Sequence, residues 1–208
     1  LKKLLAIGLP SGGESISYNF SQICIQRICN LFENFVINTR VFANMFAMLS
    51  YIYGSAIAQA SQIVVGYLMG SKRIEDTNRR VMTTLKMAML IGVAISATLL
   101  LLSEPLYGLF TKDSRVVELG RTIMMIELVL ELGRAGNMVI IRALQAAGDV
   151  NFPIIVGTIE LWIVAVGLGY VFSVVLGWGL VGIWIAMAID ECTRAIIFFF
   201  RWKSGVWK

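Results

Sequence analysis

Residues 85–102 read LKMAMLIGVAISATLLLL, an almost purely aliphatic run with one charged residue near its start. A helix of this length rises about 27 Å at 1.5 Å per residue, close to the thickness of about 30 Å of a bilayer's hydrocarbon core. The run therefore predicts a transmembrane helix.

Five further apolar stretches flank this run, separated by short polar links. They lie at residues 9–30, 41–69, 116–145, 152–176 and 180–200. Each is long enough to cross a bilayer, since a span needs about 20 residues. The sequence therefore predicts an all-α membrane protein, with residues 1–208 forming one bundle of six transmembrane helices.

The overall composition points to the same class. The 208 residues are 58% hydrophobic and only 15% charged, with a mean hydropathy of +0.78. A soluble domain usually has about 25% charged residues, because much of its surface must face water. This composition excludes a water-soluble globular domain.

Several kinds of chemistry are excluded by missing residue types. There is no histidine, so neither Ser-His-Asp nor Cys-His catalysis is available. Cys24, Cys29 and Cys192 are scattered without a CxxC pair, which argues against a disulfide framework or a zinc site. No nucleic-acid-binding motif accompanies the net charge of +5. We expect no enzyme, no metal site, no cofactor and no nucleic-acid partner.

Basic residues gather on one side of the predicted spans, which indicates a topology. One side has nine Lys and Arg residues and the other has three. The nine are Lys2, Lys3, Lys72, Arg73, Arg79, Arg80, Arg201, Lys203 and Lys208, and the three are Arg40, Lys112 and Arg115. Because cytoplasmic loops are richer in Lys and Arg, we expect a multi-pass plasma-membrane protein with both ends of this segment in the cytoplasm.

The fourth predicted span contains the strongest candidate site. Glu127, Glu131 and Arg134 are spaced so that all three share one helical face, and Asn137 extends this polar stretch. Glu131 and Arg134 can pair along the helix, whereas Glu127 has no obvious local partner. One interpretation is an ion pair that holds the bundle together. The other is a proton or cation site in which Glu127 or Glu131 titrates.

Charged residues in other spans have more than one interpretation. Glu14 lies one turn after Pro10, where it either lines a transporter cavity or is an interfacial carboxylate at a helix N-terminus. Glu160 in the fifth span is expected to partner Arg142 or Arg194 across helices. In the sixth span, Asp190, Glu191 and Arg194 are spaced for ion pairs along one helix, most simply a structural cluster.

An ordered set of short motifs resembles the multidrug and toxic compound extrusion (MATE) transporters. The set consists of Gly8-Leu9-Pro10, the segment VGYLMGSKR at 65–73, Leu109-Phe110-Thr111 with Asp113, and the segment LQAAGD at 144–149 with Pro153. Their order and spacing are similar to the second six-helix lobe of that fold, across essentially all of the chain.

The resemblance implies a fold and an activity. MATE transporters have twelve helices in two lobes of six, with substrate bound between or inside the lobes. They expel organic cations and drugs in exchange for sodium ions or protons. This chain would then be one lobe, and its partners would be the lipid bilayer, an organic cation or drug, and a missing N-terminal lobe or a second copy.

The residues depart from the family pattern at the expected ion site. Many members have an aspartate in the fourth span of this lobe, eleven positions before a loop arginine. Here Gln145 matches that loop arginine and Arg134 takes the place of the aspartate, with Glu131 one turn earlier. The first-span acid usually lies about two turns after the proline, whereas Glu14 lies one turn after Pro10.

The sequence supports one leading hypothesis and two alternatives. The leading hypothesis is a cation-coupled antiporter lobe in which Glu14, Glu127 and Glu131 are the coupling carboxylates and Arg134 holds or tunes them. Asn137 belongs to the same cation-coupling or substrate-binding set. A lipid-linked oligosaccharide flippase of related architecture is the first alternative, although it should have a more basic cavity. A membrane fragment that does not transport is the second.

Overall fold

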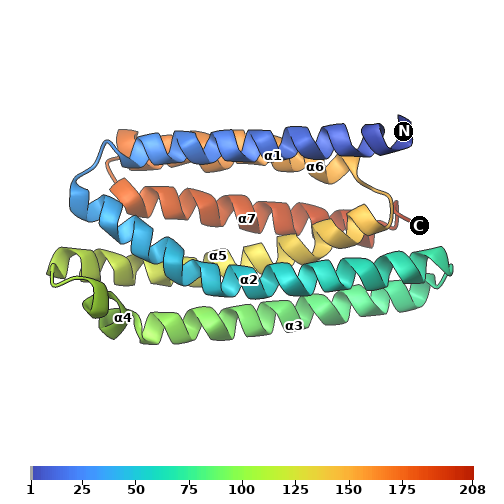
Figure 1. Ribbon diagram of the computed structural model, residues 1–208, viewed down its shortest axis with the longest axis horizontal. Helices are drawn as coiled ribbons and strands as arrows, with labels where there is room; N and C mark the ends of the chain where they lie inside the picture. The colour runs from blue at the N-terminus through green and yellow to red at the C-terminus, as the bar shows by residue number, and fades with distance from the viewer. Residues whose placement is uncertain (1) are drawn as a thin grey trace.

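The computed structural model describes the backbone of residues 2–208 and the side chains of residues 16–208. In the described residues the elements are α1 (Lys2–Cys29), α2 (Asn34–Gly70), α3 (Ile74–Leu101), α4 (Ser103–Phe110), α5 (Ser114–Ala146), α6 (Asn151–Glu160), η1 (Leu161–Leu168), η2 (Val171–Val175) and α7 (Gly179–Lys203). The rods run roughly parallel or antiparallel along one axis (Figure 1). The all-α fold class expected from the sequence is confirmed.

The helices form three layers in Figure 1, with α1 and α6 in one, α5 and α7 in the middle, and α2 and α3 in the third. Helix α5 contacts α2, α3, α4 and α7, so its neighbours cover it on most sides. The start of α1 and the end of α7 lie at the same end of the bundle as the turn between α2 and α3 (Figure 1). Helix α5 is also the helix richest in charge. Its central position keeps its polar side chains away from lipid, where they would be costly.

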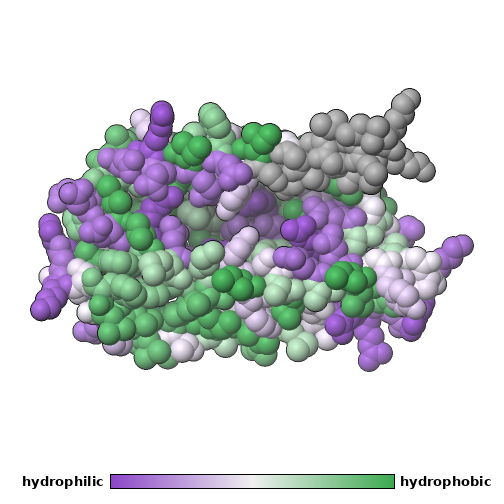
Figure 2. Space-filling view, viewed as in Figure 1, coloured by the Kyte–Doolittle hydropathy of each residue, from purple (hydrophilic) through white to green (hydrophobic). Residues whose placement is uncertain are grey.

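Three helices are long and apolar enough to cross a membrane by length and composition among the described residues: Asn34–Gly70, Ile74–Leu101 and Asn151–Val175. Helices α1, α5 and α7 are 28, 33 and 25 residues long, within the range of 25–37 residues of these three. Large hydrophobic side chains are exposed on many helices, among them Ile63 on α2 and Leu90 on α3 at 76% and 73% exposure. Figure 2 shows such hydrophobic residues covering the α2–α3 face.

Several helices begin well before the apolar stretches that identify them. Helix α3 begins at Ile74, although the aliphatic run begins at residue 85, because polar residues including Glu75 and Asp76 continue its hydrogen-bonded turns. Acidic residues in a first turn also complement the positive end of the helix dipole. Apolar content therefore marks the part of a helix that faces lipid or core, not its whole length.

Helix α5 begins at a side-chain cap. Asp113 accepts a hydrogen bond from the backbone N–H of Arg115 at 3.0 Å, and its carboxylate pairs with the Arg115 guanidinium at 3.0 Å. The Arg115 side chain, followed by its backbone N–H, holds the pKa of the Asp113 carboxyl below its usual value. The cap thus satisfies a backbone donor that a helix start leaves without a partner.

The rod formed by α6, η1 and η2 departs from regular α-helix. In η1 and η2 the backbone bonds span five residues instead of four, as in the bond of 2.9 Å from the Leu176 N–H to the Val171 carbonyl. The neighbouring α7 passes very close, since a Cβ on Gly182 would lie 2.6 Å from the Phe172 carbonyl carbon. The wide turns thus coincide with a tight helix crossing.

Candidate functional site

Three charged residues of α5 form one buried cluster near the middle of the bundle. Arg134 Nη1 lies 2.8 Å from Glu127 Oε1 and 2.8 Å from Glu131 Oε2. The side chains of both glutamates are at most 3% exposed, and that of Arg134 is 12% exposed. The spacing i, i+4 and i+7 brings the three onto one face of α5, as a helical period requires.

Glu127 has partners, contrary to the expectation that it lacks one. Arg134 reaches back two turns to it, and the indole N–H of Trp184 on α7 donates to Glu127 Oε2 at 2.8 Å. The expectation failed because it considered only pairs one turn apart, and because Trp184 comes from a different helix. Both oxygens of the Glu127 carboxylate are therefore engaged.

Glu131 lies where α2, α3 and α5 meet. The Ser50 hydroxyl on α2 donates to Glu131 Oε2 at 3.0 Å. On α3, a Cβ at Gly92 would lie 3.0 Å from Glu131 Oε1, so this glycine leaves room for the carboxylate. The expected pairing of Glu131 with Arg134 is present, and the carboxylate additionally ties α5 to α2.

Asn137 connects this cluster to a second one on α7. Its side-chain amide donates to Glu191 Oε2 at 2.7 Å. Arg194 pairs with Asp190 and also with Glu191, at 3.3 Å in the second case, as the spacing along α7 predicts. Two oxygens there, Asn137 Oδ1 and Asp190 Oδ1, are buried without a hydrogen-bond partner among the described residues.

Two other expected site residues behave differently. Glu160 accepts a hydrogen bond from the Thr193 hydroxyl at 3.0 Å and forms no ion pair with Arg142 or Arg194 among the described residues. The expected pairing is wrong because Arg194 is taken by acids on its own helix. The side chain of Glu14 lies outside the described residues.

The joined clusters contain more acids than bases. Glu127, Glu131, Asp190 and Glu191 surround two guanidinium groups, those of Arg134 and Arg194. Ionised carboxylates are costly inside a membrane unless they are paired, so an excess of acid in this position favours uptake of a cation or proton. Among the described residues, no group of three or more His, Cys, Asp or Glu side chains has the arrangement of a metal site.

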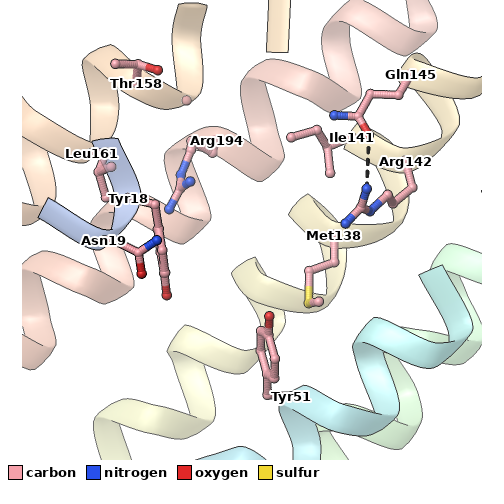
Figure 3. Close-up of a pocket in the computed structure, with 11 residues that line it drawn as sticks. Tyr18, Asn19, Tyr51, Met138, Ile141, Arg142, Gln145, Thr158, Leu161 and Arg194 are labelled. Atoms are coloured by element: carbon pink, nitrogen blue, oxygen red, sulfur yellow. Dashed lines mark hydrogen bonds between the residues drawn. The ribbon is translucent and has the colours of Figure 1, made fainter. Parts of the chain in front are cut away.

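A cavity of about 460 Å³ lies beside the clusters, between α1 on one side and α2 and α5 on the other. Its lining residues are Tyr18, Asn19, Tyr51, Met138, Ile141, Arg142, Gln145, Gly157, Thr158, Leu161 and Arg194. Figure 3 shows Tyr18, Tyr51, Arg142 and Arg194 extending into this space from four different helices. Figure 2 shows hydrophilic residues gathered in a hollow of the surface between the layers that hold α1 and α2.

Sequence reasoning found the charges but not what surrounds them. Trp184, Ser50 and Gly92 lie inside apolar stretches with no pattern that sets them apart from packing residues. Tyr18 and Tyr51 likewise come together only through the tertiary fold. The one usable signal was the charged face of α5.

Comparison with known proteins places these observations in a family. The MatE family model matches residues 10–171. The chain is 36% identical over 207 residues to the uncharacterized transporter YisQ of Bacillus subtilis, covering 100% of this chain and 46% of that protein. It is 27% identical over 200 residues to the probable multidrug resistance protein NorM of the same organism, covering 96% of this chain and 44% of that one. The chain thus spans about half the length of these relatives.

Solved structures agree on the fold. A crystal structure of MATE in the straight conformation superimposes with a TM-score of 0.87 at 22% identity, covering all of this chain and 47% of that one. A multidrug resistance MATE transporter in the outward-facing conformation gives a TM-score of 0.86 at 22% identity, again covering 47%. The chain therefore belongs to the MatE family of membrane transporters, and its fold is that of one lobe.

Proposed function

We propose that this chain is one lobe of a cation-coupled antiporter that exports organic cations or drugs across the plasma membrane. The observation that carries the proposal is the buried cluster in which four carboxylates surround two guanidinium groups. Relatives named as probable multidrug resistance proteins support export as the task. The activity belongs to the full-length protein, in which a second lobe, from the same polypeptide or another copy, completes the transport pathway.

The geometry offers a way to couple ion binding to helix arrangement. Arg134 is shared by two carboxylates, of which Glu131 holds α2 through Ser50 and Glu127 holds α7 through Trp184. A proton or sodium ion on one carboxylate weakens that carboxylate's hold on Arg134 and on its helix partner. The ion thereby favours the arrangement that retains the other set of contacts.

Asn137 extends this coupling to the second cluster. Its side-chain N–H donates one hydrogen bond to Glu191, while its carbonyl oxygen is buried without a partner among the described residues. An oxygen of this kind suits a cation, since amide oxygens ligate hard ions well. Glu14, on the first span, completes the proposed set on the ground of sequence alone.

The coupling role is tested with charge-neutral variants in the full-length protein. Glu127→Gln and Glu131→Gln should each reduce ethidium export from cells and flatten its dependence on an imposed pH or sodium gradient. Glu118→Gln is the matched control, because this residue lies on the same helix but is exposed. Unchanged export with unchanged gradient dependence in both site variants would show that the coupling role is wrong.

We also propose that both ends of this segment lie in the cytoplasm, on the basis of the asymmetry of Lys and Arg. In a cysteine-free background, Lys72→Cys and Lys208→Cys should react with a membrane-impermeant maleimide only after the cells are permeabilised. Lys112→Cys, at the opposite end of the bundle, should react in intact cells. The reverse labelling pattern would contradict this orientation.

A further inference from the structure

The cavity beside α5 has a basic end that the coupling mechanism does not use. Arg142 lines the cavity and is exposed, and its described hydrogen bond is one of 3.3 Å to the Gln145 side chain. None of the ion pairs among the described residues includes it. In Figure 3 the guanidinium of Arg142 extends away from the α5 backbone into the open space. A guanidinium with free donors in a pocket is suited to a carboxylate, which it can bind through two parallel hydrogen bonds.

A second guanidinium lines the same cavity. Arg194 pairs with acids of α7, yet its Nε is buried without a hydrogen-bond partner among the described residues. The pairing with Asp190 and Glu191 offsets its charge, so Arg142 is the stronger anion-binding group. The cavity is thus more basic at the Arg142 end than at the Arg194 end.

The walls between these ends are aromatic and polarizable. Tyr18 and Tyr51 extend from α1 and α2, and Met138 and Leu161 line the cavity beside them (Figure 3). Aromatic and methionine side chains pack well against planar rings. The volume of about 460 Å³ lies within the range usual for small-molecule sites, about 300–1,000 Å³.

We infer that this cavity binds aromatic carboxylates, with the carboxylate on Arg142 and the ring between Tyr18 and Tyr51. The inference rests on the proposed export function and names a class of compound that the export site accepts besides organic cations. An anionic lipid headgroup would also satisfy Arg142. The two tyrosines and Met138 favour a ring over a headgroup, because a headgroup has no planar apolar surface for them to cover.

Binding is measured on the purified full-length protein by equilibrium dialysis with labelled 2-naphthoate. Arg142→Gln should weaken 2-naphthoate binding about tenfold, the factor that corresponds to about 1.4 kcal/mol, and Arg142→Lys should recover part of the loss. Arg80→Gln removes the same charge at an exposed site outside the cavity and should leave binding unchanged. The neutral amide 2-naphthamide should bind to the wild type about tenfold more weakly than 2-naphthoate does. Its own affinity should be the same for Arg142→Gln and for Arg80→Gln, because it has no charge for Arg142 to pair with.

The aromatic contact is tested with two tyrosine variants on α2, one inside the cavity and one outside it. Tyr51→Leu should weaken 2-naphthoate binding about threefold, within the range for loss of an aromatic pair. Tyr67→Leu, at a site 75% exposed and outside the cavity lining, should have no effect. Melting temperatures of all variants show whether each is folded.

Three results would overturn the inference. One is the absence of 2-naphthoate binding, and another is binding that Arg142→Gln does not weaken. The third is an Arg142→Gln protein that loses phosphatidylglycerol binding in nanodiscs but keeps 2-naphthoate binding, which would assign Arg142 to a lipid headgroup. Ethidium export by the same variants separates the two proposals. Coupled ethidium export without 2-naphthoate binding refutes only this inference, whereas 2-naphthoate binding without gradient-dependent export refutes the proposed function.

Discussion

The crossing of α5 and α7 at Gly133 leads to a sharp prediction about stability. A Cβ at this position would lie 2.6 Å from the backbone nitrogen of Cys192 and 2.7 Å from the carbonyl carbon of Glu191. Ordinary contact begins near 3.4 Å, so Gly133→Ala requires the two helices to separate by about 0.8 Å. The obstacle is backbone on both sides, so no side-chain rotation can relieve it.

The size of the effect follows from two opposing contributions. Overpacking of this kind costs about 1–3 kcal/mol. Alanine in place of glycine within a helix regains about 1 kcal/mol. Gly66→Ala on α2 receives the same gain but meets no atom within 4 Å. The difference in stability between the two variants therefore isolates the contact with α7, at about 1–3 kcal/mol.

The assay is thermal unfolding of the purified full-length protein in detergent, followed by tryptophan fluorescence. For unfolding of the 208-residue lobe, 1 kcal/mol corresponds to about 2–4 °C. Gly133→Ala should therefore melt about 2–12 °C below Gly66→Ala. It should also impair gradient-coupled export, because Arg134 and Glu191 adjoin the contact. A Gly133→Ala protein that melts at or above the Gly66→Ala value would refute the close crossing.

Three further outcomes are expected. Arg134→Met should destabilise the protein by about 3–5 kcal/mol because it leaves two buried carboxylates unpaired, whereas a triple variant that also changes both partner glutamates to Gln should regain most of that loss in the same melting assay. Tyr107→Phe should raise the melting temperature, because the Tyr107 hydroxyl is buried without a hydrogen-bond partner among the described residues, and a lower value would contradict this. The Arg115 contacts hold the pKa of Asp113 below its unfolded value, so they stabilise the fold above about pH 4 and this contribution disappears as the pH falls through the folded pKa. The melting advantage of wild type over Asp113→Asn should therefore shrink in acid, and an advantage that persists at pH 2 would count against the cap.

Much of the architecture could be predicted because lipid imposes a simple pattern. Apolar stretches of about 20 residues locate the long helices, and glycine and proline mark the turns between them. The short helix α4 was missed, since Ser103–Phe110 has too few residues for a periodic signal. The wide turns of η1 and η2 were also missed, because residues 161–175 are largely apolar and give no sign of their hydrogen-bond spacing.

The candidate site was predictable only within a single helix. The pairing of Glu131 with Arg134 follows from spacing along α5, as does the pairing of Asp190 with Arg194 along α7. The contact of Glu127 with Trp184 depends on how two helices rotate against each other, which no local pattern fixes. Which side chains are buried between two helices is decided by the packing of the whole bundle, so it cannot be predicted from one helix alone.

The π-helical rod has a consequence for motion. A turn with i→i+5 bonds holds one residue more than the α-helical turn that could replace it. If one such turn in η1 or η2 changed to the α form, the register would slip by one residue, a rotation of about 100° about the helix axis. Thr158 and Leu161 would then swing relative to Ser173, which is held against Gly182 of α7. In the rod formed by α6, η1 and η2, such a change would turn the part of the cavity wall that holds Thr158 and Leu161.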